Sequence, residues 1–150
     1  MKMNRFFRTI YAFKHLYRVN RIFITVFGIK EWIKYPRILT HDLDKLLRML
    51  WKYNKGYNAT HHMKRSHHMV YIFNSSNENL VSLNNIREMA CDLESGRYKN
   101  VGKDFTSMEY FTRWKKINNV WWNGMDKKIK KMITVSLKEV KAKHKYPKVK

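Results

Sequence analysis

Residues 4–27, NRFFRTIYAFKHLYRVNRIFITVF, decide the fold class of this chain. Apolar and aromatic side chains, with one histidine among them, recur here at spacings of three and four residues, which is the repeat of one helix face. These positions are Phe7, Tyr11, His15, Val19 and Ile22. Gly28 follows where such a helix is expected to stop. The stretch predicts a long N-terminal helix with His15 on its inward-packing side.

Four more helices are predicted downstream, over residues 40–53, 85–96, 106–118 and 127–142. Thr40 is a good N-cap for the first of them. Asn85 with Glu88, and Thr106 with Glu109, are spaced like capping boxes at the starts of the next two.

Two segments are predicted to be less regular. Residues 29–37 are expected to be a connector, because Pro36 disfavours a helix interior, and residues 57–83 show no clear repeat. The lysine-rich residues 141–150 are expected to fray. The sequence therefore predicts an all-α, compact bundle of five to six helices, one domain over residues 1–150, with a basic tail from about residue 143.

The composition limits the classes of protein to which the chain can belong. The 150 residues carry a formal net charge of +21, and 44% of them are hydrophobic, which is enough for a core. Cys91 is the single cysteine, which excludes an internal disulfide framework and fits a reducing compartment. No run approaches the roughly 20 apolar residues of a membrane span, and no signal peptide is recognisable. We expect a cytoplasmic protein, in the host cytoplasm if a phage encodes it.

The charge is unevenly distributed. Residues 1–40 have a net charge of +8, residues 41–100 of +3, and residues 101–150 of +10. The middle segment also holds five of the seven histidines and six of the eleven acidic residues. So large a basic excess predicts attraction to polyanions, and the composition of the middle segment suggests that it houses a distinct site.

Histidines and aspartates stand out in a fixed order along the chain. They are His15, the doublet His41-Asp42, the pairs His61/His62 and His67/His68, and Asp92. Neutral imidazole is a common ligand of transition metals. Asp92 lies four residues after Glu88, so two like charges share a helix face, and a cation would relieve their repulsion. The alternative interpretations are a solvated basic loop for the four clustered histidines and a surface acid for Asp92.

This order resembles that of the HD-domain superfamily of metal-dependent phosphohydrolases, which are all-α bundles around one or two metal ions. The resemblance implies that His15, His41, Asp42 and Asp92 hold the first ion. It implies that histidines of the pairs His61/His62 and His67/His68, one of each or both, bind a second ion or the substrate phosphate.

The resemblance is closer to a group of short, uncharacterised bacterial and phage proteins of this kind. It rests on His41-Asp42-Leu43-Asp44-Lys45, on His61-His62-Met63-Lys64-Arg65-Ser66-His67-His68, and on Glu88-Met89-Ala90-Cys91-Asp92. By this likeness Asp42, Lys45, His62 and His67 are catalytic residues. Lys45, together with the neighbouring cations Lys64 and Arg65, supplies positive charge to a phosphate.

The sequence thus predicts a metal-dependent phosphohydrolase that acts on a nucleotide, a cyclic nucleotide or a nucleic-acid phosphoester. The cofactor is one or two divalent ions, of Mn, Fe, Ni, Zn, Mg or Co. Two alternatives stay open: a catalytically idle HD-like domain that binds nucleic acid through its basic surfaces, and a phage protein that binds a host protein. A homodimer is left open as well.

The last fifty residues mix lysines with aromatic side chains. This composition is typical of single-strand nucleic-acid surfaces, and it is equally typical of amphipathic helices with aromatic residues in the core. We expect the second arrangement for Trp114 and Trp121. Cys91 lacks the context of a catalytic thiol and is expected to be buried.

Overall fold

The computed structural model describes residues 5–41, 43, 81–96, 107–117 and 119–144. Its elements are α1 (Arg5–Phe27), α2 (Ile29–Lys34), the 3-10 helix η1 (Pro36–Thr40), α6 (Leu83–Gly96), α7 (Ser107–Ile117), α8 (Asn119–Gly124) and α9 (Lys127–Lys143). Every regular element of these residues is helical, which confirms the all-α prediction.

Helix α1 forms where the apolar repeat predicted it. Val19, Ile22, Phe23 and Val26 are almost fully buried, at the spacing of one helical stripe. Gly28 ends the helix with φ = 91°, a left-handed conformation that glycine adopts without the strain a Cβ would cause. Its N–H donates to the carbonyl of Ile24 over 3.0 Å.

The segment predicted as a connector contains two short helices. Helix α2 fills residues 29–34, and Pro36 then opens η1 at a position where a missing N–H costs nothing. Thr40 is the last residue of η1, and its hydroxyl donates back to the carbonyl of Arg37 over 2.8 Å. Thr40 was predicted to be an N-cap, but in the structure it closes the end of η1. The rest of the predicted helix over residues 40–53 lies outside the described residues, apart from a helical Leu43.

Helix α6 starts two residues earlier than predicted. The hydroxyl of Ser82 accepts the backbone N–H of Asn85 over 3.1 Å, so Ser82 caps the helix. The predicted capping box of Asn85 and Glu88 is wrong: Asn85 is already inside the helix, and the carboxylate of Glu88 is buried on its inner face. The helix ends at Gly96, as predicted.

The C-terminal part forms α7, a short α8 that the sequence did not predict, and α9. Asp126 caps α9 by accepting the backbone N–H groups of Lys128 and Ile129 over 2.6 and 3.2 Å, which confirms the predicted start. Residues 141–143 continue α9, so the expectation of fraying is wrong for them. The proposed cap Thr106 lies outside the described residues, as do the side chains of Trp114 and Trp121.

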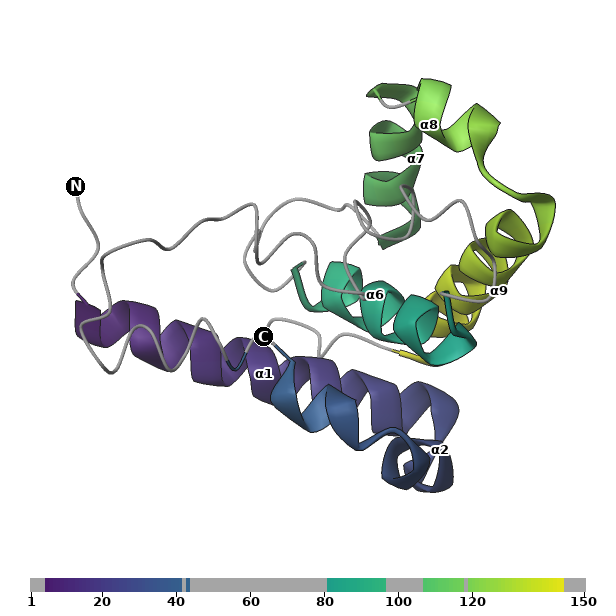
Figure 1. The fold of residues 1–150 in the computed structure, drawn as a ribbon. Coiled ribbons are helices and arrows are strands. Elements are labelled where there is room, and N and C mark those ends of the chain that lie inside the picture. Colours follow the sequence, from purple (N-terminus) through teal and green to yellow (C-terminus); the bar gives the residue numbers. More distant parts are fainter. Residues whose placement is uncertain (1–4, 42, 44–80, 97–106, 118, 145–150) are drawn as a thin grey trace.

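Figure 1 shows how the helices are layered. Helix α6 packs on α1 and on α9, η1 lies along α1, and α7 packs on α6 and α9. The buried apolar side chains of the described residues form one cluster; its most buried members include Phe23, Ile38, Ile86, Phe111 and Leu137. Cys91 belongs to this cluster, as predicted, and burial raises the pKa of its thiol well above the ordinary value. None of the described helices is long and apolar enough to cross a membrane.

Candidate metal centre

Three side chains from three separate elements converge where α1, η1 and α6 meet. His15 comes from the middle of α1, His41 follows η1, and Asp92 comes from α6. Nε2 of His15 lies 3.3 Å from Nε2 of His41 and 3.1 Å from Oδ1 of Asp92. Nε2 of His41 lies 3.7 Å from the same oxygen. We call these residues the histidine–aspartate triad.

The local backbone explains how His41 reaches the triad. The residue has φ = −51° and ψ = 121°, which are not helical values, so its side chain leaves the direction of η1 and turns toward α1. Its imidazole is completely buried, whereas His15 and Asp92 keep 14% and 25% of their side-chain surface exposed. The triad thus has a closed inner side and a partly open outer side.

Glu88 fixes the orientation of the His41 ring. Its Oε1 lies 2.9 Å from Nδ1 of His41, and both side chains are buried. Because a carboxylate only accepts hydrogen bonds, Nδ1 carries a proton, and in the neutral ring the lone pair of Nε2 faces the triad. A carboxylate behind a ligating histidine is the usual outer partner in metal sites.

Tyr35 holds Glu88 in turn, and Asn85 lies beside the same hydroxyl. The Tyr35 hydroxyl lies 2.7 Å from Oε2 of Glu88 and 2.8 Å from Oδ1 of Asn85. The single hydroxyl proton goes to the carboxylate, the stronger acceptor. Burial, together with the negative charge of Glu88, raises the pKa of Tyr35 far above its ordinary value, so this hydroxyl stays a donor.

A matching contact orients His15. Oγ of Ser95, one turn beyond Asp92 on α6, lies 2.9 Å from Nδ1 of His15. When Nδ1 carries the proton and donates to this hydroxyl, Nε2 is left as an acceptor toward the triad. Both histidines therefore have a partner on Nδ1 and present Nε2 to the same point.

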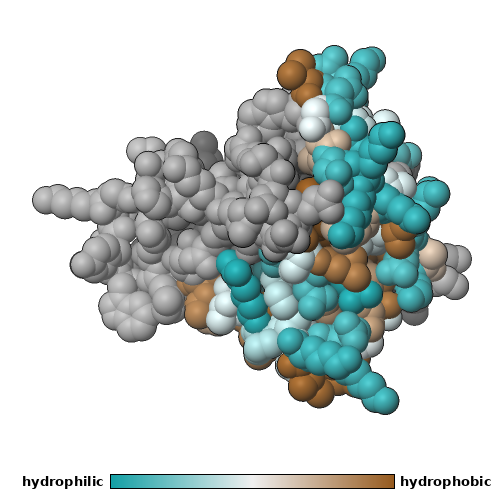
Figure 2. All heavy atoms as spheres, turned by 45° about the vertical axis from the view of Figure 1, so that its right-hand side comes forward, coloured by the Kyte–Doolittle hydropathy of each residue, from teal (hydrophilic) through white to brown (hydrophobic). Residues whose placement is uncertain are grey.

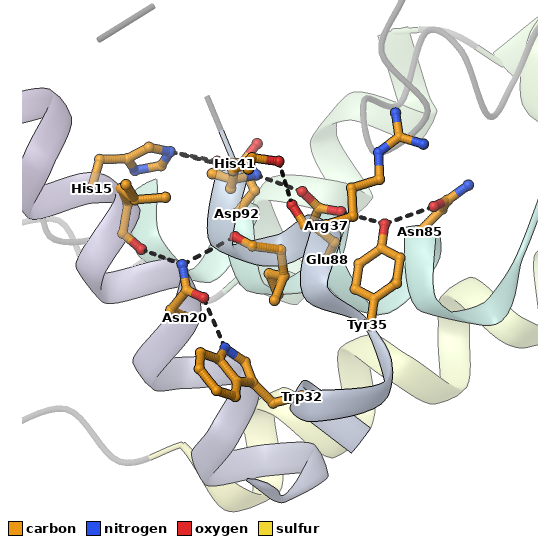
Figure 3. A network of polar contacts seen from close by, with 12 residues as sticks. His15, Asn20, Trp32, Tyr35, Arg37, His41, Asn85, Glu88 and Asp92 are labelled. Carbon is orange, nitrogen blue, oxygen red and sulfur yellow. Dashed lines mark hydrogen bonds and ion pairs between the residues drawn. The ribbon is translucent and has the colours of Figure 1, made fainter. Parts of the chain in front are cut away.

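Asn20 fastens η1 to α1 and so places His41. Its Nδ2 donates to the carbonyls of Leu16 and Ile38 over 2.9 and 3.1 Å, and its Oδ1 accepts the indole N–H of Trp32 over 2.8 Å. One amide thereby joins three elements, α1, α2 and η1, a few residues before His41 (Figure 3).

The two histidines also set the ionisation of Asp92. Burial on its own opposes a charged carboxylate, but hydrogen bonds from His15 and then His41, donated where Nε2 carries a proton, outweigh it and hold the pKa of Asp92 well below its ordinary value. A bound metal ion would take the place of these protons. The carboxylate is therefore anionic at neutral pH and available as a ligand.

The triad fits a divalent ion by its donor set and its spacing. The ligand atoms of His15, His41 and Asp92 all lie within 4.8 Å of one another. Donors bound at about 2.0–2.1 Å around a four-coordinate ion lie about 3.3–3.4 Å apart, and the three separations here are 3.3, 3.1 and 3.7 Å. Two imidazoles and one carboxylate are ligands that Zn, Fe, Mn and related ions share, so the donor set leaves the metal open.

Three of the predicted metal ligands, His15, His41 and Asp92, are thus brought together. The other predicted residues of the site lie outside the described residues; they are Asp42, Lys45, His61, His62, Lys64, Arg65, His67 and His68. The sequence interpretation missed Glu88 as a partner of His41. A signal was present, because Glu88 lies four residues before Asp92 on the same face of a helix.

Comparison of the chain with models of known families, with curated proteins and with solved structures finds no match. The resemblance to the HD-domain superfamily therefore stays a prediction, and the geometry of the triad is what supports a function.

Proposed function

We propose that this chain is a metal-dependent phosphohydrolase of the HD type, acting on the phosphoester of a nucleotide, a cyclic nucleotide or a nucleic acid. One observation carries the proposal: His15, His41 and Asp92, separated by 26 and 51 positions, meet at one point. These are three of the four residues to which the sequence resemblance assigns the first metal ion.

The described residues would hold and orient the ion. Nε2 of His15, Nε2 of His41 and a carboxylate oxygen of Asp92 are the ligand atoms. A divalent ion bound there lowers the pKa of a coordinated water and neutralises charge that builds on phosphoryl oxygens. Glu88 accepts a hydrogen bond from the Nδ1–H group of His41, which orients the ring and leaves Nε2 as the nitrogen that would bind the ion.

The remaining roles come from the sequence: from the resemblance and, for Lys64 and Arg65, from their positive charge between the two histidine pairs. Asp42 would be the fourth ligand and would orient the attacking water. Lys45, Lys64 and Arg65 would place positive charge at the substrate phosphate. His61, His62, His67 and His68 would supply the second ion or the phosphate contact. The proposal also includes a phosphate-bearing substrate as partner and residence in the cytoplasm.

The decisive experiment is metal analysis of the purified protein, followed by assays on mononucleotides, cyclic nucleotides and single-stranded nucleic acid. We expect bound divalent metal in the wild type and its loss in Asp92→Asn, which keeps the shape of the side chain but removes its charge. His144→Gln is the matched control, because His144 pairs with Glu94 and stands outside the triad. Full metal content in Asp92→Asn, or activity that survives chelation, would contradict the proposal.

The idle HD-like domain remains the second candidate, favoured by the net charge of +21. Metal binding without turnover on any phosphoester of the panel would favour it. Turnover that disappears together with the metal in Asp92→Asn would exclude it.

A further inference from the structure

Helix α9 presents a row of lysines to solvent on the side away from the core. It contains seven lysines and a single acidic residue, Glu139. At 3.6 residues per turn, Lys127, Lys131 and Lys138 project within about 40° of one another, and all three are exposed. The opposite side of the helix is buried through Ile129, Ile133, Ser136, Leu137 and Val140. We call the exposed row of Lys127, Lys131 and Lys138 the lysine face.

Neighbouring helices extend this positive surface. Figure 2 shows long hydrophilic side chains projecting from the side of the molecule that it brings forward. Between residues 107 and 144 the described residues include ten lysines and arginines against three acidic residues. One of the three, Asp126, accepts backbone N–H groups as the N-cap of α9.

Two further lysines are held in place at the edge of the lysine face. Nζ of Lys130 lies 5.6 Å from the centre of the Trp122 ring and donates to the carbonyl of Asn123 over 3.1 Å. Nζ of Lys115, from α7, lies 5.0 Å from the same ring. Two cations are thus gathered on one indole, each attracted by its π system, and their mutual repulsion favours binding of an anion nearby.

The character of the surface selects the kind of polyanion. A helix that inserts into a membrane surface buries an apolar face in the lipid, but the apolar face of α9 is already buried in the core. The described aromatic side chains near it pack on each other: Phe111 is buried, and its ring centre lies 5.4 Å from that of Trp122 in an edge-on arrangement. Apart from Val135 and Ala142, the exposed side chains of α9 are lysines, whose ammonium groups suit phosphates, and its described surface offers no aromatic platform for bases.

The length of the row suits a nucleic acid. Lys127 and Lys138 are 11 residues apart, which corresponds to about 16 Å along a helix. A duplex carries one phosphate charge for about every 1.7 Å of its axis, so a segment of this length holds roughly ten around its circumference, and the row can contact those on the near side. Helical geometry fixes the direction of the row, while the lysine side chains stay adaptable.

We propose that the lysine face of α9 binds the phosphate backbone of nucleic acid without sequence specificity, as a function separate from the histidine–aspartate triad. The binding is electrostatic, so it needs no metal ion. It weakens steeply with salt, because salt cations compete with the lysines for the phosphates.

The test is fluorescence anisotropy with two unrelated 24-base-pair duplexes, with chelator present and over a range of salt concentrations. The variant Lys127→Gln/Lys131→Gln/Lys138→Gln removes the lysine face. The control Lys14→Gln/Arg21→Gln/Lys30→Gln removes exposed charges from α1 and α2, so both lower the formal net charge from +21 to +18. Thermal melts establish that both are folded, since exposed substitutions of this kind change stability little.

We expect the wild type to bind both duplexes equally. The variant of α9 should bind about tenfold or more weakly, and the slope of its salt dependence should be shallower by up to about 0.9 for each phosphate that it no longer neutralises. The control should stay within about threefold of the wild type. Equal losses of affinity in the two triple variants would mean that net charge alone acts. No duplex binding at low salt, or binding only to vesicles containing phosphatidylserine, would overturn the proposal.

Discussion

The histidine–aspartate triad with the side chains that orient it, here called the buried polar cluster, and the lysine face of α9 are both built from ionisable groups. They are organised in opposite ways. In the cluster, His41 and Glu88 are buried, with 2.9 Å between Nδ1 and Oε1. Each histidine there is paired with a carboxylate. On the lysine face, Lys127, Lys131 and Lys138 are exposed and carry the same charge. Only the first arrangement depends on fixed distances.

The difference follows from desolvation. A polar group taken out of water loses its hydration, so each buried member of the cluster needs a particular partner in a particular place. An exposed lysine keeps its water, and its effect on a distant anion depends on the number and position of charges. Changes in the cluster should therefore appear in stability and metal affinity, and changes on the lysine face in salt-dependent binding.

The largest effect is expected from Glu88→Leu. This change leaves the ring N–H of His41 buried without its acceptor and removes the hydrogen bond from Tyr35, whose hydroxyl keeps Oδ1 of Asn85. A buried group without an acceptor costs about 1–3 kcal/mol, so we expect a loss of about 3 kcal/mol in the free energy of unfolding, measured in urea. Lys138→Leu, the same kind of change on the lysine face, should stay within about 0.5 kcal/mol. Similar losses of stability in the two variants would mean that burial does not make the cluster more sensitive to substitution than the lysine face.

A second prediction separates metal affinity from stability. Glu88→Gln keeps the size of the side chain but removes the carboxylate behind His41, and metal affinity should fall by about 10- to 100-fold. Glu94→Gln is the matched control: Glu94 is equally buried on α6 and lies 3.3 Å from a histidine, but that histidine is His144. Isothermal titration with Zn²⁺ or Mn²⁺ should show the loss in Glu88→Gln alone. Equal losses would mean that any buried carboxylate of α6 matters alike.

Asn20 offers a smaller test of how the cluster is held. Asn20→Ala removes hydrogen bonds to Leu16, Ile38 and Trp32 at once, and we expect a loss of about 2 kcal/mol in the free energy of unfolding. Trp32→Phe removes one of these three hydrogen bonds together with part of the packed indole, so the comparison is made on metal affinity, which should fall less than in Asn20→Ala. Metal affinity should fall in Asn20→Ala although the residue is no ligand, because η1 would no longer hold His41 at α1. Unchanged affinity would show that η1 is placed by packing alone.

Much of this architecture was predictable because it depends on local sequence. The apolar repeat of α1, the stop at Gly28 and the N-cap Asp126 each depend on residues within a few positions of one another. The short helices α2 and α8 were missed because six residues give too little repeat to recognise.

Interactions between distant parts of the chain were harder to foresee. The order of His15, His41 and Asp92 suggested ligands, because the residue types limit the chemistry. The partners behind them were hidden: Glu88 and Tyr35 are 53 positions apart, and Ser95 and His15 are 80 apart. Glu88 also satisfied a local pattern, the capping box, so a local explanation concealed a tertiary one. Burial decided between the two, and burial is a property of the fold.

The smallest effects are expected at the two N-caps, Ser82 for the helix of the cluster and Asp126 for the helix of the lysine face. Ser82→Ala and Asp126→Ala should each cost about 1 kcal/mol in stability, because each leaves backbone N–H groups without an acceptor. Asp126→Ser keeps a capping oxygen and removes a negative charge beside Lys127, so stability should be nearly retained while duplex binding strengthens by a few-fold at low salt. Ser82→Ala should leave duplex binding unchanged, since it alters no charge. If Asp126→Ser binds the duplex no more tightly than the wild type, the phosphates do not approach the start of α9. The contact with nucleic acid would then be assigned to the other end of the helix, near Lys138 and Lys141.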